Sequence, residues 1–371
     1  MLAAAWPAVG GCGARETSTS SSEAASNQPT ERLSTEKSPG DGDKRAADEL
    51  LAEADVLAKS GDFKAAIKRY SDLIAAAPEP TAYAHRADSL IATGDIERGL
   101  ADYRAAIRLA PRDASLYLAR AKALVIKRRF TLANADCDRA IALRPRWGDA
   151  YLVRGNIQLE TQNWDAAIPD LDAAIRLMEN PSSPYNNRGV ARLYKGQLDL
   201  ALADYTAALK HNKEFADAYN NRGDLFARRG KLEEALADFS EAIRISPYAL
   251  PVYENRADVY VRQGRPEQAL TDYTKIIERS LKQAANQSAK LQSGAKLGRV
   301  YRKRAAALLA LDRADDALSD VNEAIDLNPD DSDAFGVRQR IHLKKGQSKE
   351  AADDEQRATE ILVRQLPEAK L

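Results

Sequence analysis

Arginine and aspartate recur in this chain in a pattern that can form ion pairs, because one aspartate stands sixteen residues after each arginine of a series. The arginines are Arg86, Arg120, Arg154, Arg188, Arg222, Arg256, Arg304 and Arg338, and the aspartates are Asp102, Asp136, Asp170, Asp204, Asp238, Asp272, Asp320 and Asp354. Glu53 and Arg69 repeat the pattern with the charges exchanged, which makes sense only if both partners belong to one repeated unit. We therefore predict nine structural pairs, partly buried, of which Arg222 with Asp238 is one.

The arginines belong to an internal repeat. A tyrosine stands three residues before six of them, at Tyr83, Tyr117, Tyr151, Tyr185, Tyr219 and Tyr253, so that five successive gaps measure 34 residues. A repeat of this length indicates one supersecondary unit that buries its apolar face only by stacking on its neighbours. Such a chain usually presents a surface to a partner and does not assemble a catalytic site.

The repeated units can be aligned residue by residue. Their first residues are Ala47, Pro80, Ala114, Gly148, Ser182, Ala216, Leu250, Gly298 and Ser332. Most carry an aromatic residue at the fourth position, a small residue at the eighth, alanine at the twentieth and an aromatic residue at the twenty-fourth, and several carry proline at the thirty-second. This resembles the tetratricopeptide repeat over roughly 47–365. The resemblance implies an all-α fold, an α-solenoid of about nine stacked helix pairs in a right-handed superhelix, with the first helices lining its concave side.

Two regions depart from the array of 47–365. Units seven and eight start 48 residues apart, at Leu250 and Gly298, so we expect a helical insertion near 281–296, with a flexible loop as the alternative. Residues 1–46 include a stretch rich in Ser, Thr, Glu, Gly and Pro with few large apolar residues, which predicts a disordered N-terminal segment. Residues 366–371 form a short C-terminal tail.

The N-terminal segment contains Val9-Gly10-Gly11-Cys12, which resembles the lipobox of bacterial lipoproteins. The resemblance implies lipidation of Cys12, attachment to a membrane through it, and a place in the bacterial cell envelope. Only 11 residues precede Cys12 and none is basic, whereas a signal segment usually has about 15–30 residues with a basic start. A misassigned start codon would explain both departures. The alternatives are an accidental cysteine in a disordered segment and a cytoplasmic protein.

Composition and motifs give no support to catalysis. Lysine plus arginine equals aspartate plus glutamate at 55 each, and no basic stripe indicates nucleic-acid binding. The three histidines are scattered without metal-ligand spacing, and Cys137 takes an aromatic core position, where a buried thiol is inert. Because no phosphate loop, nucleophile elbow or HExxH motif occurs, we expect no enzyme activity, no cofactor and no metal.

The resemblance also predicts a binding groove, because the second, fifth, sixth, ninth, twelfth and thirteenth positions of first helices tend to face the concave side. The predicted groove residues are apolar Leu118, Leu152 and Val153, then Asn186, Asn187, Asn220, Asn221 and Asn255, then basic Arg299, Arg302 and Lys303. Asparagine donates and accepts at once, so a row of asparagines suits the backbone of an extended peptide. The row resembles the asparagine ladder of tetratricopeptide glycosyltransferases, and Asn255, Arg299 and Lys303 resemble part of the carboxylate clamp of chaperone-binding domains.

These features predict a non-enzymatic scaffold that binds an extended peptide or protein segment in its groove. The expected segment is apolar over units three and four and acidic, or a free C-terminus, near unit eight. Two alternatives remain. One is a regulatory or targeting subunit that acts through the convex face or the inserted hairpin, and the other is an accessory subunit of an enzyme encoded on another chain. The asparagines can equally be common features of such repeats around a groove that holds water.

Overall fold

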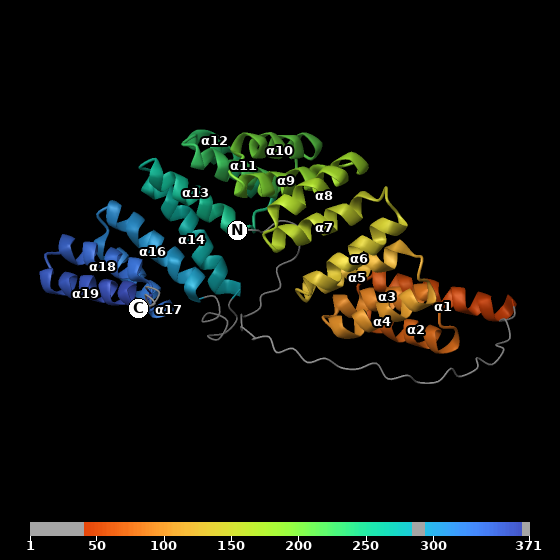
Figure 1. The fold of residues 1–371 in the computed structure, drawn as a ribbon. Helices are drawn as coiled ribbons and strands as arrows, with labels where there is room; N and C mark the ends of the chain where they lie inside the picture. The colour runs from red at the N-terminus through yellow and green to blue at the C-terminus, as the bar shows by residue number, and fades with distance from the viewer. Residues whose placement is uncertain (1–40, 284–293, 366–371) are drawn as a thin grey trace, which may run out of the picture. The chain divides into compact units, whose positions relative to one another are not determined.

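The described part of the chain is entirely helical. The computed structural model describes residues 41–283 and 294–365, which form eighteen α-helices and no strand. They divide into two compact units between Lys195 and Gly196. Within each unit, helix pairs follow one another in chain order (Figure 1). The predicted all-α fold built of stacked helix pairs is confirmed.

The part of the first unit that the structure describes, 41–195, contains nine helices. They are α1 (Asp41–Lys59), α2 (Phe63–Ala76), α3 (Pro80–Ala92), α4 (Ile96–Leu109), α5 (Ala114–Ile126), α6 (Phe130–Leu143), α7 (Gly148–Glu160), α8 (Trp164–Leu177) and α9 (Ser182–Tyr194). The helices of one repeat pack on each other, as α3 does on α4, and each second helix then packs on the first helix of the next repeat, as α4 does on α5. First helices of successive repeats also touch, as α5 and α7 do.

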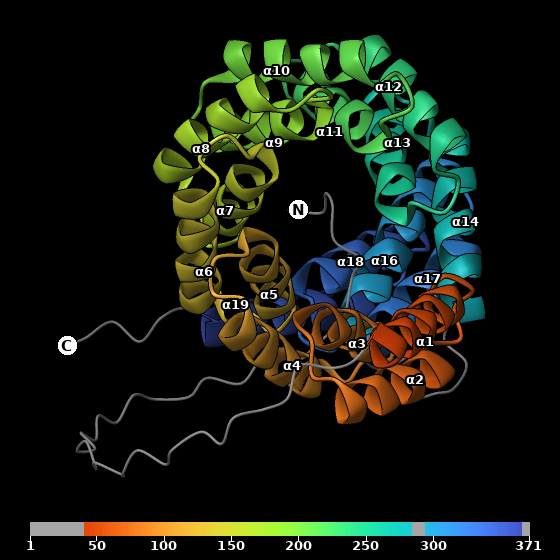
Figure 2. The ribbon, with the colours of Figure 1, turned by 90° about the vertical axis from the view of Figure 1, so that its right-hand side faces the viewer.

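The second unit repeats this arrangement. Its described helices are α10 (Leu198–His211), α11 (Ala216–Arg228), α12 (Leu232–Ile245), α13 (Leu250–Arg262), α14 (Pro266–Gln283), α16 (Gly294–Ala310), α17 (Ala314–Leu327), α18 (Ser332–Lys344) and α19 (Ser348–Gln365). First helices α11 and α13 lie on one side of this unit, and second helices α10, α12 and α14 lie on the other (Figure 2). The side formed by α11, α13, α16 and α18 is called the first-helix face below.

Seven first helices begin at the residues that the repeat alignment predicts, from Pro80 to Leu250 and again at Ser332. The other two begin earlier. Helix α1 starts at Asp41, so the predicted disordered segment of 1–46 is wrong for residues 41–46. Aspartates at positions 41 and 43 favour a helix N-terminus, where the helix dipole is positive, and the alanines after them are good helix formers.

The turn between the two helices of a repeat requires a left-handed backbone. Gly230 supplies it between α11 and α12 with φ 76°, at no steric cost. Three repeats have no glycine there, and Arg128, Gln162 and Asp312 adopt φ of 55°, 59° and 61°. The turn is therefore set by the packing of the two helices, since residues with a side chain accept the same conformation.

Small residues at the eighth and twentieth positions let the paired helices approach closely. A Cβ atom added to Gly223 on α11 would lie 2.9 Å from the ring of Phe239 on α12. Ala235 and Phe239 are 0% and 1% exposed at this crossing. The contact is closer than ordinary packing, so the glycine is needed for this helix separation.

The predicted insertion is flanked by lengthened helices. Helix α14 has 18 residues where α12 has 14, and α16 has 17 residues where α13 has 13. Residues 284–293 lie outside the described residues, so the form of the insertion stays a prediction. Cys12 and the tail of 366–371 also lie outside them. Across 41–283 and 294–365, no helix has the length and apolar character needed to cross a membrane.

Candidate protein-binding surface

The structure brings the predicted arginine–aspartate partners together within single repeats. In seven repeats the arginine Nε and Nη2 atoms donate to the two carboxylate oxygens at 2.6–3.1 Å. These aspartate side chains are 3–11% exposed and the arginine side chains 18–26%. Such a two-pronged contact fixes the guanidinium plane and with it the two helices. The predicted pair of Arg188 with Asp204 spans the division between the units and stays a prediction.

The pair of exchanged charges differs from the others. Arg69 Nη2 donates a single bond of 3.0 Å to Glu53 Oε1, and the two side chains are 42% and 49% exposed. This predicted pair is therefore present and is more exposed than the seven others. Glu53 lies on α1, so no described helix pair precedes this repeat to cover the contact.

The aromatic residue three residues before each arginine, a tyrosine in seven repeats and Phe335 in the last, stacks on it. The guanidinium carbon lies 5.2–5.9 Å from the centre of an aromatic ring in eight repeats. Residues three apart on a helix are neighbours. The positive guanidinium is attracted to the face of the ring, where the ring's electrons give a partial negative charge. The Tyr-x-x-Arg spacing thus places a ring beside the arginine on the same helix. The arginine is held by this ring and by a carboxylate on the next helix.

Six of the arginines also reach the preceding repeat, a contact that the sequence interpretation missed. The third donor, Nη1, bonds an acceptor at the twenty-fifth position of that repeat, and the acceptors are Ser71, Asp138, Asp172, Ser240, Thr274 and Asn322. The arginines therefore link neighbouring repeats as well as the helices of one repeat. Arg104 takes the twenty-fifth position before Arg120, and no bond joins these two like charges.

The predicted groove asparagines form two chains of amide hydrogen bonds. In the first unit, Asn186 Nδ2 donates to Asn187 Oδ1 at 3.1 Å, and Asn187 Nδ2 donates to Asn156 Oδ1 at 2.7 Å. In the second unit, Asn255 Nδ2 donates to Asn220 Oδ1 at 2.9 Å. Asn186 and Asn187 are buried, whereas Asn156, Asn220, Asn221 and Asn255 are half-buried. Each chain thus ends at a half-buried amide on a first helix.

The predicted basic end of the groove is neutralised by carboxylates of the protein itself. Arg299 and Lys303 on α16 both bond Glu254 on α13, at 3.1 and 2.8 Å, and Lys303 also bonds Asp258 at 2.6 Å. Arg302 forms ion pairs with Asp331 and Asp333. Glu254 is 7% exposed, so its charge requires these partners. These three residues are therefore paired within the chain, and their predicted role in binding an acidic ligand stays a prediction.

The predicted apolar patch of the groove lies mostly in the core. Leu118 and Val153 are 2% and 5% exposed and pack in one apolar cluster of the first unit, whereas Leu152 is half-buried. In that cluster Leu118 and Val153 pack against residues of the neighbouring repeats. Only Leu152 among the three retains surface for a ligand, so the predicted apolar patch is wrong for the other two.

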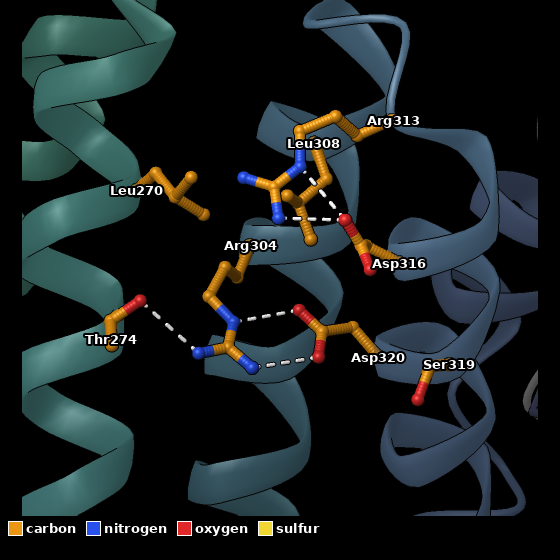
Figure 3. A pocket seen from close by; sticks show the side chains of 8 residues that line it. All are labelled: Leu270, Thr274, Arg304, Leu308, Arg313, Asp316, Ser319 and Asp320. Carbon is orange, nitrogen blue, oxygen red and sulfur yellow. Dashed lines mark hydrogen bonds and ion pairs between the residues drawn. The ribbon is translucent and has the colours of Figure 1, made fainter.

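A hollow of about 260 Å³ lies between α14, α16 and α17 (Figure 3). Its charged groups bind one another. Arg304 is bonded by Asp320 and Thr274, and Arg313 is paired with Asp316. The polar side chains converge on each other and not on an empty centre, so these contacts hold three helices together and leave no charge for a ligand.

Other candidate reactive groups are occupied or inert. Cys137 is 0% exposed, and burial raises the pKa of its thiol to about 12. His85 Nδ1 lies 2.8 Å from Asp55 Oδ1, and Asp55 also accepts the hydroxyl of Tyr70 at 2.7 Å. In the ranges 41–283 and 294–365 no group of three acidic, histidine or cysteine residues is placed to hold a metal ion.

The sequence matches the tetratricopeptide repeat family over residues 51–114, 85–150, 118–184, 186–249 and 302–367, with a second profile of the same family at 250–283. These matches cover most of the chain, which therefore belongs to the tetratricopeptide repeat family. Proteins of this family are protein-interaction scaffolds, and their fold is typically non-enzymatic. A comparison with curated proteins finds no match.

Solved structures share the fold at low sequence identity. One chain in the structure of the APC/C hetero-tetramer Cut9–Hcn1 is 16% identical, over 81% of this chain and 57% of that chain, with a TM-score of 0.55. This likeness shows the fold alone. A tetratricopeptide repeat protein from Parabacteroides merdae is 17% identical over 71% of this chain and 98% of that chain, with a TM-score of 0.49. YrrB, a TPR protein with an unusual peptide-binding site, is 26% identical over 49% of this chain and 95% of that chain, with a TM-score of 0.40.

Proposed function

We propose that the chain is a non-enzymatic scaffold whose first-helix face in the second unit binds an extended segment of a partner protein. The observation that carries the proposal is the amide pair of Asn255 and Asn220. Their bond uses one donor of Asn255 and one acceptor site of Asn220, and neither side chain forms another hydrogen bond with a described residue. The two N–H donors of Asn220 and the carbonyl oxygen of Asn255 therefore remain for a peptide, which offers one carbonyl and one N–H per residue.

The charges on this face favour recognition of the backbone over recognition of a strongly acidic partner. Arg299 and Lys303 are compensated by Glu254 and Asp258, so an acidic ligand would have to displace carboxylates that are already bonded. Neutral amides next to paired charges suit a ligand of mixed sequence. Binding should accordingly change little between low and moderate salt, because no unpaired charge of this set is screened.

The test is a selection of peptides on the whole chain, followed by titration of a selected peptide against variants. Asn220→Ala and Asn255→Ala should each weaken binding by about five- to tenfold, as the loss of one hydrogen bond of about 1 kcal/mol or slightly more gives. Asn163→Ala is the control, because Asn163 is exposed in the turn before α8 and its side chain caps no helix. Equal affinity in all three variants would place binding on the second-helix face or the insertion instead, which suits a regulatory or accessory subunit.

We also propose that Cys12 attaches the protein to a bacterial membrane, a proposal that rests on the sequence Val9–Cys12 alone. One acyl chain anchors only weakly, so stable attachment needs the several chains of a bacterial lipoprotein. Protein made in its own host should partition into detergent, and Cys12→Ser should release it. Native protein whose mass includes unmodified residues 1–12 would refute the attachment and leave a cytoplasmic location.

A further inference from the structure

A hollow of about 340 Å³ lies near the end of the second unit, between α16, α18 and α19. Its walls are partly apolar. Val337 on α18 is 5% exposed and Leu362 on α19 is 54% exposed. Volumes of this size lie at the lower end of the roughly 300–1,000 Å³ typical of ligand pockets.

The hollow is open because Gly336 stands in the middle of α18. The fifth position of earlier first helices carries a side chain such as Leu152 or Asn220, whereas at Gly336 an added Cβ atom would meet nothing within 4 Å. Glycine inside a helix costs roughly 0.5–1 kcal/mol relative to alanine. Neither close packing nor a left-handed backbone requires a glycine at position 336. The structural effect of Gly336 is therefore the open space that a side chain would otherwise occupy.

The charge of the hollow is positive. Arg302, Arg340 and Asp333 all line it. Arg302 is bound by Asp331 and Asp333, so its charge is compensated. Arg340 is exposed, donates only a long bond of 3.4 Å to the carbonyl of Gly336, and forms no ion pair with any described residue. An uncompensated guanidinium thus stands beside an apolar hollow.

We propose that this hollow receives one apolar side chain of a partner segment that carries a carboxylate next to that side chain. The side chain would lie over Gly336 against Val337 and Leu362, and the carboxylate would pair with Arg340. The inference rests on the proposed peptide binding to the first-helix face, to which Gly336 and Arg340 belong, and it adds a specificity pocket to the recognition of the backbone by Asn220 and Asn255.

The probe for the experiment is N-acetyl-L-leucine, which combines an isobutyl side chain with a carboxylate. It is titrated into the whole chain while the ¹³C-methyl NMR signals of Val337 and Leu362 are followed. We expect saturable shifts of both signals. N-acetyl-L-leucine amide should bind about two- to fivefold more weakly, as loss of an exposed ion pair gives, and N-acetylglycine should cause no saturable shift.

Variants separate the apolar and the ionic contribution. Gly336→Leu fills the hollow and should abolish the shift of Leu362, whereas Gly336→Ala should fold at least as stably as the natural chain and weaken binding only partly. Arg340→Gln should lower the affinity for the probe to that of its amide. Arg262→Gln is the matched control, because Arg262 is an exposed arginine on α13 without an ion pair among the described residues.

Three results would overturn the inference. They are no saturable shift of the Val337 and Leu362 signals, an unchanged Leu362 shift in Gly336→Leu, and binding of N-acetylglycine as tight as that of N-acetyl-L-leucine. The last result would mean that the probe binds only as an anion at a surface arginine. The selected peptide distinguishes this failure from failure of the proposed function. If Asn220→Ala weakens that peptide while Gly336→Leu does not, the first-helix face binds the segment and the hollow has no part in it.

Discussion

Reversal of one buried charge tests how the arginines stabilise the array. Arg222→Glu places two carboxylates where Arg222 and Asp238 now form a two-pronged pair at 2.7 and 2.8 Å. The side chains are 20% and 8% exposed, so the loss should be about 3 kcal/mol, the lower end of the range for buried pairs. The matched reversal Arg69→Glu affects a pair whose side chains are 42% and 49% exposed and should cost at most about 1 kcal/mol.

The double variant Arg222→Glu with Asp238→Arg should recover only part of that loss. Arg222 also stacks on Tyr219 at 5.6 Å and on Phe226 at 5.8 Å, both on its own helix. An arginine at position 238 lies on α12 and loses these rings, each worth about 0.5–1 kcal/mol. We therefore expect a remaining deficit of about 1–2 kcal/mol.

Hydrogen exchange of the α11 and α12 amides is the suitable assay, because long repeat arrays do not unfold in a single two-state step. Urea unfolding followed by circular dichroism gives the global effect. A double variant as unstable as the sum of the single variants would show that the two residues do not interact. A double variant as stable as the natural chain would show that the stacking of Arg222 contributes nothing.

Three further predictions concern the first unit. Arg104→Ser should stabilise the first unit by about 1 kcal/mol, because Nη1 of Arg120 gains the acceptor that other repeats have. Arg108→Ser on the same helix should not stabilise it. Hydrogen exchange of the α4 and α5 amides measures both effects. Burial and a neighbouring carboxylate raise the pKa of Tyr103. The contribution of this group to the free energy of unfolding is therefore complete below about pH 10 and is lost as the pH rises further. Above that pH, the urea midpoint should fall less steeply with pH in Tyr103→Phe than in the natural chain. Burial raises the pKa of Cys137 to about 12, so alkylation of the native chain at pH 8 should be slow and should follow unfolding, as mass spectrometry would show.

The sequence predicts the helix pairs well because their determinants are local and repeated. Seven first helices begin at the predicted residue, and the arginine–aspartate pairing follows from a constant offset that only the two helices of one repeat can satisfy. The early start of α1 was missed because the repeat alignment has no position before Ala47. The extension of 41–46 reads Asp-Gly-Asp-Lys-Arg-Ala, which lengthens a helix without contributing to a signature.

The contacts between repeats were harder to predict, because their partners vary in identity. The twenty-fifth position holds serine, aspartate, threonine or asparagine, which share only an acceptor oxygen. A search for acceptors at that position would have found the signal. The ion pairs of the basic residues on α16 were missed for a related reason, since position on a helix indicates which face a side chain joins and does not show the carboxylate opposite. Glu254 stands one repeat earlier and neutralises Arg299 and Lys303.

These internal pairs limit what the first-helix face can recognise. A repeat array gains stability only from contacts between neighbours, so charged residues at those contacts are used to join repeats and are not available to a ligand. On the first-helix face of the second unit, Arg299, Arg302 and Lys303 are used in this way. The groups that these pairs leave include the amides of Asn220 and Asn255 and the exposed guanidiniums of Arg262 and Arg340. Under the proposed function, specificity on this face comes from backbone hydrogen bonds and from the hollow over Gly336, and a partner selected for negative charge alone should not bind it well.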